Sequence, residues 1–151
     1  MYYLAYGSNL NIEQMGFRCP TAHIVGTATI KDYQLVFKGS KSGSYLSIER
    51  AKGHEVPVAV WDVKDSDIRS LDCYEGYPNF YYKKQMLVDC SDGKRHRCFV
   101  YIMHEYRPFG IPSCYYVDTC LRGYDSFGFN PQLIYDAIDL SVREIKEKRC
   151  V

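Results

Sequence analysis

One glutamate of this 151-residue sequence has the surroundings of a general base. Glu75 stands in the segment LDCYEGYPNFY, at the end of a predicted helix that begins at Asp65 or Ser66. A carboxylate there faces the negative end of the helix dipole, and aromatic neighbours that exclude water raise its pKa further. Both effects suit acid–base catalysis. The alternative is a solvent-facing glutamate at a frayed helix end.

A second segment, Tyr6-Gly7-Ser8-Asn9-Leu10, has the residue types of an anion-binding turn. It follows a short apolar strand and precedes a predicted helix. Glycine allows close backbone approach and positive φ, and successive N–H groups in such a turn can bind an anion or an oxyanion. A plain structural turn between a strand and a helix is the alternative.

Neither nucleic-acid binding nor cofactor chemistry is predicted. Nineteen Lys and Arg residues against eighteen Asp and Glu residues give a net charge of +1, whereas proteins that grip phosphate backbones carry a clear basic excess. The seven cysteines include no Cys-x-x-Cys pair, and the four histidines include no His-x-x-x-His pair, so no zinc motif is predicted. We therefore expect no metal, no cofactor and no nucleic-acid partner.

Composition also bears on location and on the interior. The N-terminal residues lack the charged and apolar regions of a secretory signal, and no stretch approaches 18 apolar residues. An odd number of irregularly spaced cysteines indicates reduced thiols, so a cytoplasmic protein without a membrane partner is predicted. Fifteen tyrosines against one tryptophan fit a wet cavity lined by phenol groups, or ordinary β-sheet composition.

The hydrophobic pattern predicts a single α+β domain over residues 1–151. A leading strand at 2–6 is followed by a short helix capped by Asn11. Six further strands are predicted, with the 65–75 helix among them, at 23–30, 33–38, 45–49, 57–63, 80–90 and 96–104. Two C-terminal helices follow: Ser113 caps the first, which reaches towards Gly123, and Asn130 before Pro131 starts the second. Ser91-Asp92-Gly93-Lys94 indicates a hairpin turn. We expect mostly antiparallel strands in a small β-barrel, closed or nearly closed, with flanking helices.

The two chemical segments together resemble the signatures of the γ-glutamylcyclotransferase-like (AIG2-like) family. A third segment, Pro112-Ser113-x-x-Tyr116 with Gly123 and Gly128-Phe129 downstream, resembles the C-terminal helical region of that family. The resemblance runs from about residue 2 to about residue 138 and implies a small barrel with flanking helices. It implies the following site residues: Glu75 as the catalytic glutamate, Tyr6, Gly7, Ser8 and Asn9 as the substrate loop, and Tyr116 as a substrate-contacting tyrosine, or Tyr115 if the helix register differs by one.

The resemblance implies an enzyme that cyclises a γ-glutamyl dipeptide or a γ-glutamylamine to 5-oxoproline and releases the free amine. These residues do not separate the two substrate classes. A barrel of the same fold that binds a small metabolite without catalysis is the alternative, although a pure binder has no need of a base at Glu75. The expected partner is the small-molecule substrate. The apolar stripe of the last helix leaves both a monomer and a homodimer open.

Overall fold

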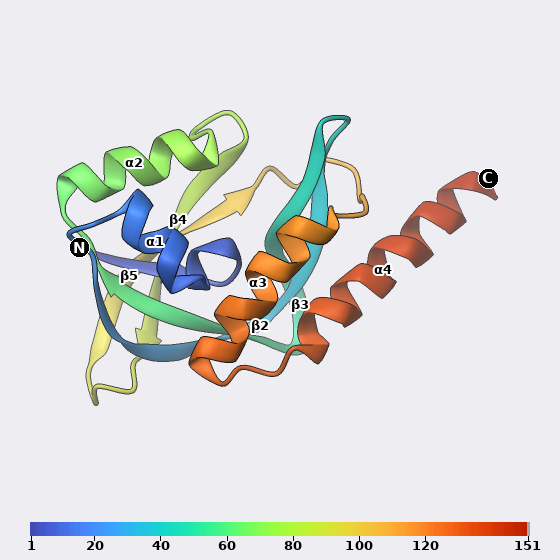
Figure 1. Cartoon of the computed structure of the whole chain (residues 1–151). Coiled ribbons are helices and arrows are strands. Elements are labelled where there is room, and N and C mark those ends of the chain that lie inside the picture. Colours follow the sequence, from blue (N-terminus) through green and yellow to red (C-terminus); the bar gives the residue numbers. More distant parts are fainter. Residues whose placement is uncertain (151) are drawn as a thin grey trace.

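A strongly bent five-stranded sheet with helices packed around it forms the fold (Figure 1). The computed structural model describes residues 1–150; residue 151, the end of the predicted domain, lies outside the described residues. The strands are β1 Tyr2–Ala5, β2 His23–Ser40, β3 Gly43–Asp62, β4 Tyr81–Asp89 and β5 Arg95–Met103. The helices are the 3-10 turn η1 Ser8–Leu10, α1 Ile12–Arg18, α2 Asp65–Glu75, α3 Cys114–Phe127 and α4 Gln132–Arg149.

The strand order is β2-β3-β1-β5-β4, and all neighbours are antiparallel except β1 and β5. The α+β class and the mostly antiparallel pairing are thus confirmed. The sheet is more open than the predicted barrel, because β2 and β4 remain at its two edges. Those edges meet beyond the end of β4, where the Ser91 N–H donates to the Thr27 carbonyl at 2.9 Å, and no ladder joins the two strands in residues 1–150.

Each of the two longest strands combines two runs that the sequence pattern separated. The predicted strands 23–30 and 33–38 are both part of β2, which pairs with β3 on both sides of residue 32. The register shifts there, from Lys31 opposite Glu55 to Tyr33 opposite Arg50. Asp32 adopts φ 62°, a left-handed conformation that Asp tolerates better than most residues. A polar interruption therefore marks a β-bulge here rather than the end of a strand.

Local capping signals correctly indicate where most helices begin. The side chains of Asn11 and Ser113 each accept a hydrogen bond from the backbone N–H three residues on, at 3.1 Å, and so cap α1 and α3. The carboxamide oxygen of Asn130 likewise accepts from the N–H of Gln132 at 3.0 Å before α4. α3 continues past the expected end at Gly123 and stops at Gly128, whose φ of 69° ends the helix.

Close packing of α3 places this helix against the turn that follows β1. A Cβ at Gly123 would lie 2.6 Å from backbone and side-chain atoms of Leu10, so the contact requires glycine. The Tyr124 hydroxyl, fully buried one residue later, donates to the Tyr6 carbonyl at 3.2 Å. The C-terminal half of α3 and the 6–10 turn are therefore held in a fixed relation.

α4 packs on β2, where the Ser141 hydroxyl donates to the Phe37 carbonyl at 3.0 Å, and its C-terminal half extends beyond the rest of the fold (Figure 1). None of the helices in the described part of the chain is long and apolar enough to cross a membrane.

Candidate functional site

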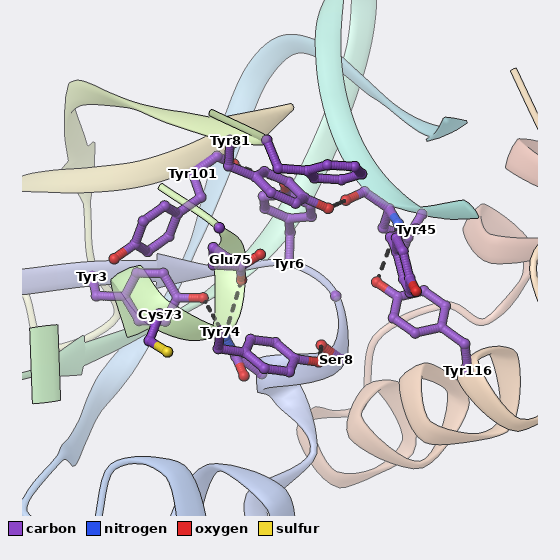
Figure 2. Close-up of a pocket in the computed structure, with 15 residues that line it drawn as sticks. Tyr3, Tyr6, Ser8, Tyr45, Cys73, Tyr74, Glu75, Tyr81, Tyr101 and Tyr116 are labelled. Atoms are coloured by element: carbon purple, nitrogen blue, oxygen red, sulfur yellow. Dashed lines mark hydrogen bonds between the residues drawn. The ribbon is translucent and has the colours of Figure 1, made fainter. Parts of the chain in front are cut away.

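A cavity of about 350 Å³ opens where the turn after β1, the end of α2, the sheet and α3 converge (Figure 2). Seven of the fifteen tyrosines of the chain line it, so the wet-cavity interpretation accounts for about half of the tyrosine content. The lining residues are Tyr3, Tyr6, Gly7, Ser8, Asn9, Tyr45, Leu46, Cys73, Tyr74, Glu75, Gly76, Phe80, Tyr81, Tyr101 and Tyr116. All six predicted site residues are among them. The lining offers one carboxylate and one thiol, too few donors for a metal site.

The end of α2 is anchored so that Glu75 points into the cavity. Leu71, one helical turn earlier, is fully buried in the core. The carboxylate of Asp72 accepts a hydrogen bond from the Tyr101 hydroxyl at 2.6 Å and lies 2.7 Å from the Lys83 ammonium. Because residues three and four apart share a helix face, these anchors fix the direction of the Glu75 side chain.

Both ends of α2 are shaped by short-range contacts. Gly76 takes φ 64° and ends the helix directly after Glu75, as the sequence predicts. The start differs from the expectation of a cap at Asp65 or Ser66. Lys64 is the N-cap residue, and the carboxylate of buried Asp67 accepts from its N–H at 3.0 Å, which satisfies that backbone group better than a hydroxyl cap one or two residues later would.

The Glu75 carboxyl lies in the cavity among phenol rings (Figure 2). Burial raises its pKa to about 8, and the Arg18 guanidinium opposes that rise without cancelling it. The Asn9 amide donates to Glu75 Oε1 at 3.4 Å. The side chain therefore exchanges a proton near neutral pH, which is what a general acid/base requires.

The Asn9 amide is oriented by Arg18, the last residue of α1. Arg18 has only donors, so it must bond the amide oxygen of Asn9, and its guanidinium also stacks 3.5 Å from the centre of the Tyr74 ring. The Asn9 NH₂ group is thereby turned to the Tyr3 hydroxyl, at 2.8 Å, and to Glu75. Arg18 thus acts on the carboxyl both through its charge and through Asn9.

The other side chains of the predicted substrate loop bond mainly to the protein itself. The Tyr6 hydroxyl donates to the Tyr101 carbonyl at 2.7 Å, and the Ser8 hydroxyl lies 3.0 Å from the Tyr74 hydroxyl. Gly7 does not adopt the expected positive φ: its φ is −129°. A Cβ at Gly7 would lie 3.4 Å from Leu46 and from the Tyr116 hydroxyl, which is an ordinary contact distance, so a longer side chain rather than a Cβ alone would intrude here.

Tyr116, and not its neighbour, faces the cavity from α3. Tyr115 is 77% exposed, whereas the Tyr116 hydroxyl is inside and accepts a hydrogen bond from the Leu46 N–H at 3.1 Å (Figure 2). Its ring also packs edge-on against Tyr45. The Tyr116 hydroxyl therefore holds a residue of β3 in place at the cavity wall.

Sequence reasoning missed Arg18 and most of the aromatic wall, including Tyr3, Tyr81 and Tyr101. Burial raises the pKa of Tyr3 and of Tyr81 well above the usual value, so these phenols stay neutral. They can donate and accept hydrogen bonds but cannot act as bases near pH 7. The tyrosine count was the signal for such a wall, although it could not say which tyrosines meet.

Residues 3–118 match the family model described as Gamma-glutamyl cyclotransferase, AIG2-like. A human gamma-glutamylcyclotransferase is 33% identical over 112 residues, which cover 69% of this chain and 60% of the human protein. A rat gamma-glutamylaminecyclotransferase is 26% identical over 111 residues, covering 69% of this chain and 74% of that protein. The chain thus matches about three fifths of the length of the human relative.

A solved structure of a gamma-glutamyl cyclotransferase superposes on the fold with a TM-score of 0.79. The two chains are 28% identical, and the superposition covers 91% of this chain and 85% of the other. YkqA from Bacillus subtilis has the same fold, with a TM-score of 0.75 at 20% identity over 92% of this chain and 54% of that chain.

Proposed function

Because this chain belongs to the gamma-glutamyl cyclotransferase, AIG2-like family, we propose that it cyclises a γ-glutamyl compound to 5-oxoproline and releases the free amine. The observation that supports this most is the Glu75 carboxyl, whose pKa of about 8 and place in an aromatic cavity suit a general acid/base. A binder without catalysis would gain nothing from a desolvated carboxyl at this position.

Glu75 carries the proton transfers in the proposed reaction. Its carboxylate removes one proton from the α-ammonium group of the substrate, and the resulting amine attacks the γ-carbonyl carbon. The ring nitrogen then releases its second proton to solvent. Protonated Glu75 returns its proton to the departing nitrogen as the carbon–nitrogen bond breaks, which leaves 5-oxoproline and the free amine. Because the attack is intramolecular, the cavity mainly has to hold the folded substrate conformer.

The cavity walls supply shape and neutral hydrogen-bonding groups. Its volume of about 350 Å³ is within the range of small-molecule sites. We propose that the backbone N–H groups of the Gly7–Asn9 turn face the anionic groups of the substrate, since the Ser8 and Asn9 side chains are already paired. Preorganised donors of this kind stabilise an oxyanion without rearranging during the reaction.

The leaving group separates two substrate classes. One of the relatives above acts on γ-glutamyl compounds and the other on γ-glutamylamines, by their names. The test is release of 5-oxoproline from a panel that holds γ-glutamyl dipeptides and γ-glutamyl-lysine isopeptides, with α-glutamyl peptides as the matched control. Release from one γ-glutamyl class and none from the control supports the proposal. Binding of 5-oxoproline without turnover of any panel member would favour the non-catalytic alternative.

The proposed reaction needs one small-molecule substrate and no further partner. We propose a cytoplasmic protein that works as a monomer or a homodimer. We also propose that it has no nucleic-acid partner, because a net charge of +1 offers no general attraction for nucleic acid.

A further inference from the structure

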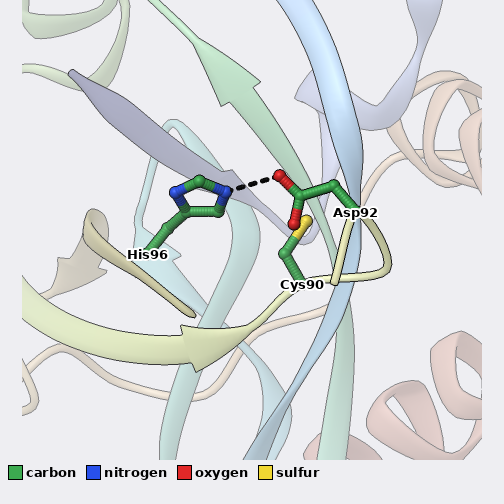
Figure 3. A group of neighbouring side chains, drawn as sticks. All are labelled: Cys90, Asp92 and His96. Carbon is green, nitrogen blue, oxygen red and sulfur yellow. Dashed lines mark hydrogen bonds and ion pairs between the residues drawn. The ribbon is translucent and has the colours of Figure 1, made fainter. Parts of the chain in front are cut away.

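Three potential metal ligands of different chemistry meet at the turn between β4 and β5 (Figure 3). The ligand atoms of Cys90, Asp92 and His96 all lie within 4.8 Å of one another. His96 Nε2 is 2.7 Å from the Asp92 carboxylate, and the Cys90 sulfur lies beside that carboxylate in Figure 3. The imidazole is only 10% exposed and the carboxylate 23%, so the group is partly shielded from water.

The turn that carries these side chains is held by backbone hydrogen bonds. The Cys90 N–H donates to the Lys94 carbonyl at 2.9 Å, and the Lys94 N–H donates to the second carboxylate oxygen of Asp92 at 2.9 Å. The His96 ring packs on Tyr2, with 4.2 Å between ring centres. Two of the three ligands are therefore fixed in orientation without any ion.

The neighbouring strand β2 fixes the turn from its other side. The Thr27 N–H donates to the Ser91 hydroxyl at 2.9 Å, and the Ser91 N–H donates back to the Thr27 carbonyl. A Cβ at Gly26 would lie 2.4 Å from the Ser91 hydroxyl oxygen and 2.9 Å from the Cys90 sulfur, so these two side chains share the space that this glycine leaves. The Cys90 sulfur is thereby confined next to Asp92.

We propose that Cys90, Asp92 and His96 bind a zinc ion. Thiolate, imidazole and carboxylate form the ligand set of zinc, and the thiolate disfavours calcium and magnesium, which prefer oxygen. The ion would replace the proton shared by Asp92 and His96, release the thiol proton of Cys90 and leave a fourth position for water. The spacing Cys-x-Asp-x₃-His contains neither of the paired motifs by which zinc sites are usually sought, so the sequence pattern did not indicate it.

The zinc ion would serve the sheet rather than the cavity. Tyr81, at the start of β4, lines the cavity, whereas Cys90 follows the other end of this nine-residue strand, about 30 Å away at the rise of an extended chain. The turn is also where the open edges of β2 and β4 meet through Thr27 and Ser91. Because all three ligands belong to the β4–β5 turn, a bound ion would stiffen this turn and so support its hydrogen bonds to β2.

The test is zinc binding by the intact, reduced chain, measured by titration calorimetry and by the thiolate absorption of the cobalt-substituted protein. We expect one tight equivalent and a higher melting temperature with zinc. Asp92→Asn should weaken the zinc affinity at least about tenfold, since mutation of a residue that only hydrogen-bonds to a metal ligand already lowers metal affinity by that factor. Asp89→Asn is the matched control, because Asp89 is an exposed acid on the same hairpin that pairs with Arg95.

Cys90→Ser should abolish the cobalt–thiolate absorption, whereas Cys114→Ser, at an exposed cysteine far along the chain, should retain it. Because Cys90 is buried, its variant is checked for folding by circular dichroism, and Asp92→Asn gives an independent answer at a more exposed residue. Equal zinc affinity in the wild type and Asp92→Asn, or no tight equivalent in the wild type, would overturn the proposal.

Discussion

Two carboxylates, one at the end of α2 near the start of β4 and the other just beyond the end of β4, differ in their surroundings and so in their chemistry. Glu75 lies in an aromatic cavity, where burial raises its pKa to about 8. Asp92 lies on the hairpin turn, where hydrogen bonds from the His96 ring and then from the Lys94 backbone lower its pKa. The same functional group is thus prepared to exchange a proton at one end and to remain an anion at the other, because of what surrounds it rather than because of its own chemistry.

Of the changes considered, Glu75→Gln should have the largest effect, because it removes the proton-exchanging member of the pair. The amide keeps the size of the side chain but removes the basic oxygen, so the rate of 5-oxoproline release should fall by about 10² to 10⁴. Ligand binding and folding should persist, because the 6–9 turn and the Leu71 anchor are untouched. Asp92→Asn, at the other end of β4, is the control and should leave the rate unchanged. A Gln variant with near-normal turnover would remove Glu75 from the mechanism.

Tyr116→Phe should have the next largest effect. The ring would remain, but the Leu46 N–H would lose its hydrogen-bond acceptor at the cavity wall. We expect kcat/KM to fall by about one to two powers of ten, as for a lost or unsatisfied hydrogen bond in a site. Tyr115→Phe is the matched control, since that side chain is exposed. Equal kinetics in both variants would mean that the Tyr116 hydroxyl has no part in the site.

The pH profile of kcat/KM tests the raised pKa of Glu75 directly, with a smaller expected effect. Because the base form of Glu75 increases with pH, kcat/KM should rise up to about pH 8 and fall about tenfold per unit well below it. Arg18→Gln removes the charge that lowers the pKa of Glu75, so the midpoint should move to higher pH. Arg18→Lys keeps a charge and should shift it less. A midpoint that Arg18→Gln leaves in place would exclude Glu75 as the group that titrates.

The two carboxylates should also contribute to stability with opposite signs. The folded pKa of Glu75 is above its unfolded value of about 4.5, so the ionised carboxyl costs the fold stability increasingly up to about pH 8. Glu75→Gln should be as stable as the wild type near pH 4 and more stable above pH 8. For Asp92 the folded pKa is lowered, so its contribution is present above the unfolded value and is lost in acid.

Asp92→Asn should therefore be less stable than the wild type at pH 7, and the difference should disappear at low pH. Urea unfolding of both variants at a series of pH values measures the two signs in one experiment. If the free energies of unfolding of the two variants changed with pH in the same way, the contrast between the carboxylates would have no effect on stability.

The sequence predicted the parts of the cavity lining that are encoded locally. Glu75 was identifiable because Leu71 and Gly76 place it within one helical turn, and Ser113 sets the register that brings Tyr116 into the cavity. Arg18 was not identifiable, because it reaches the site through an amide on a different element and through a ring on α2. Contacts of that kind depend on the assembled fold and leave no periodic signal.

The fold shows the same division between local and long-range information. Helix caps and the 91–94 hairpin turn follow from a few neighbouring residues and were predicted well. Whether the sheet closes depends on where its two edge strands arrive in space. The polar break at residue 32 indicated two strands where one bulged strand exists, because a left-handed Asp and a true turn have similar composition.

The central position of β1 has a consequence for the order of folding. Tyr2 pairs with Asp62 on one side and with Cys98 on the other, so β1 must wait for partners that follow it in the chain by about 60 and 96 residues. Such long loops are costly to close, and sheets built from them form slowly. On the ribosome the 6–10 turn would emerge early without its strand, and the cavity could assemble only after β5. Proteolysis of nascent chains halted before and after β5 should show β1 protected only in the longer ones.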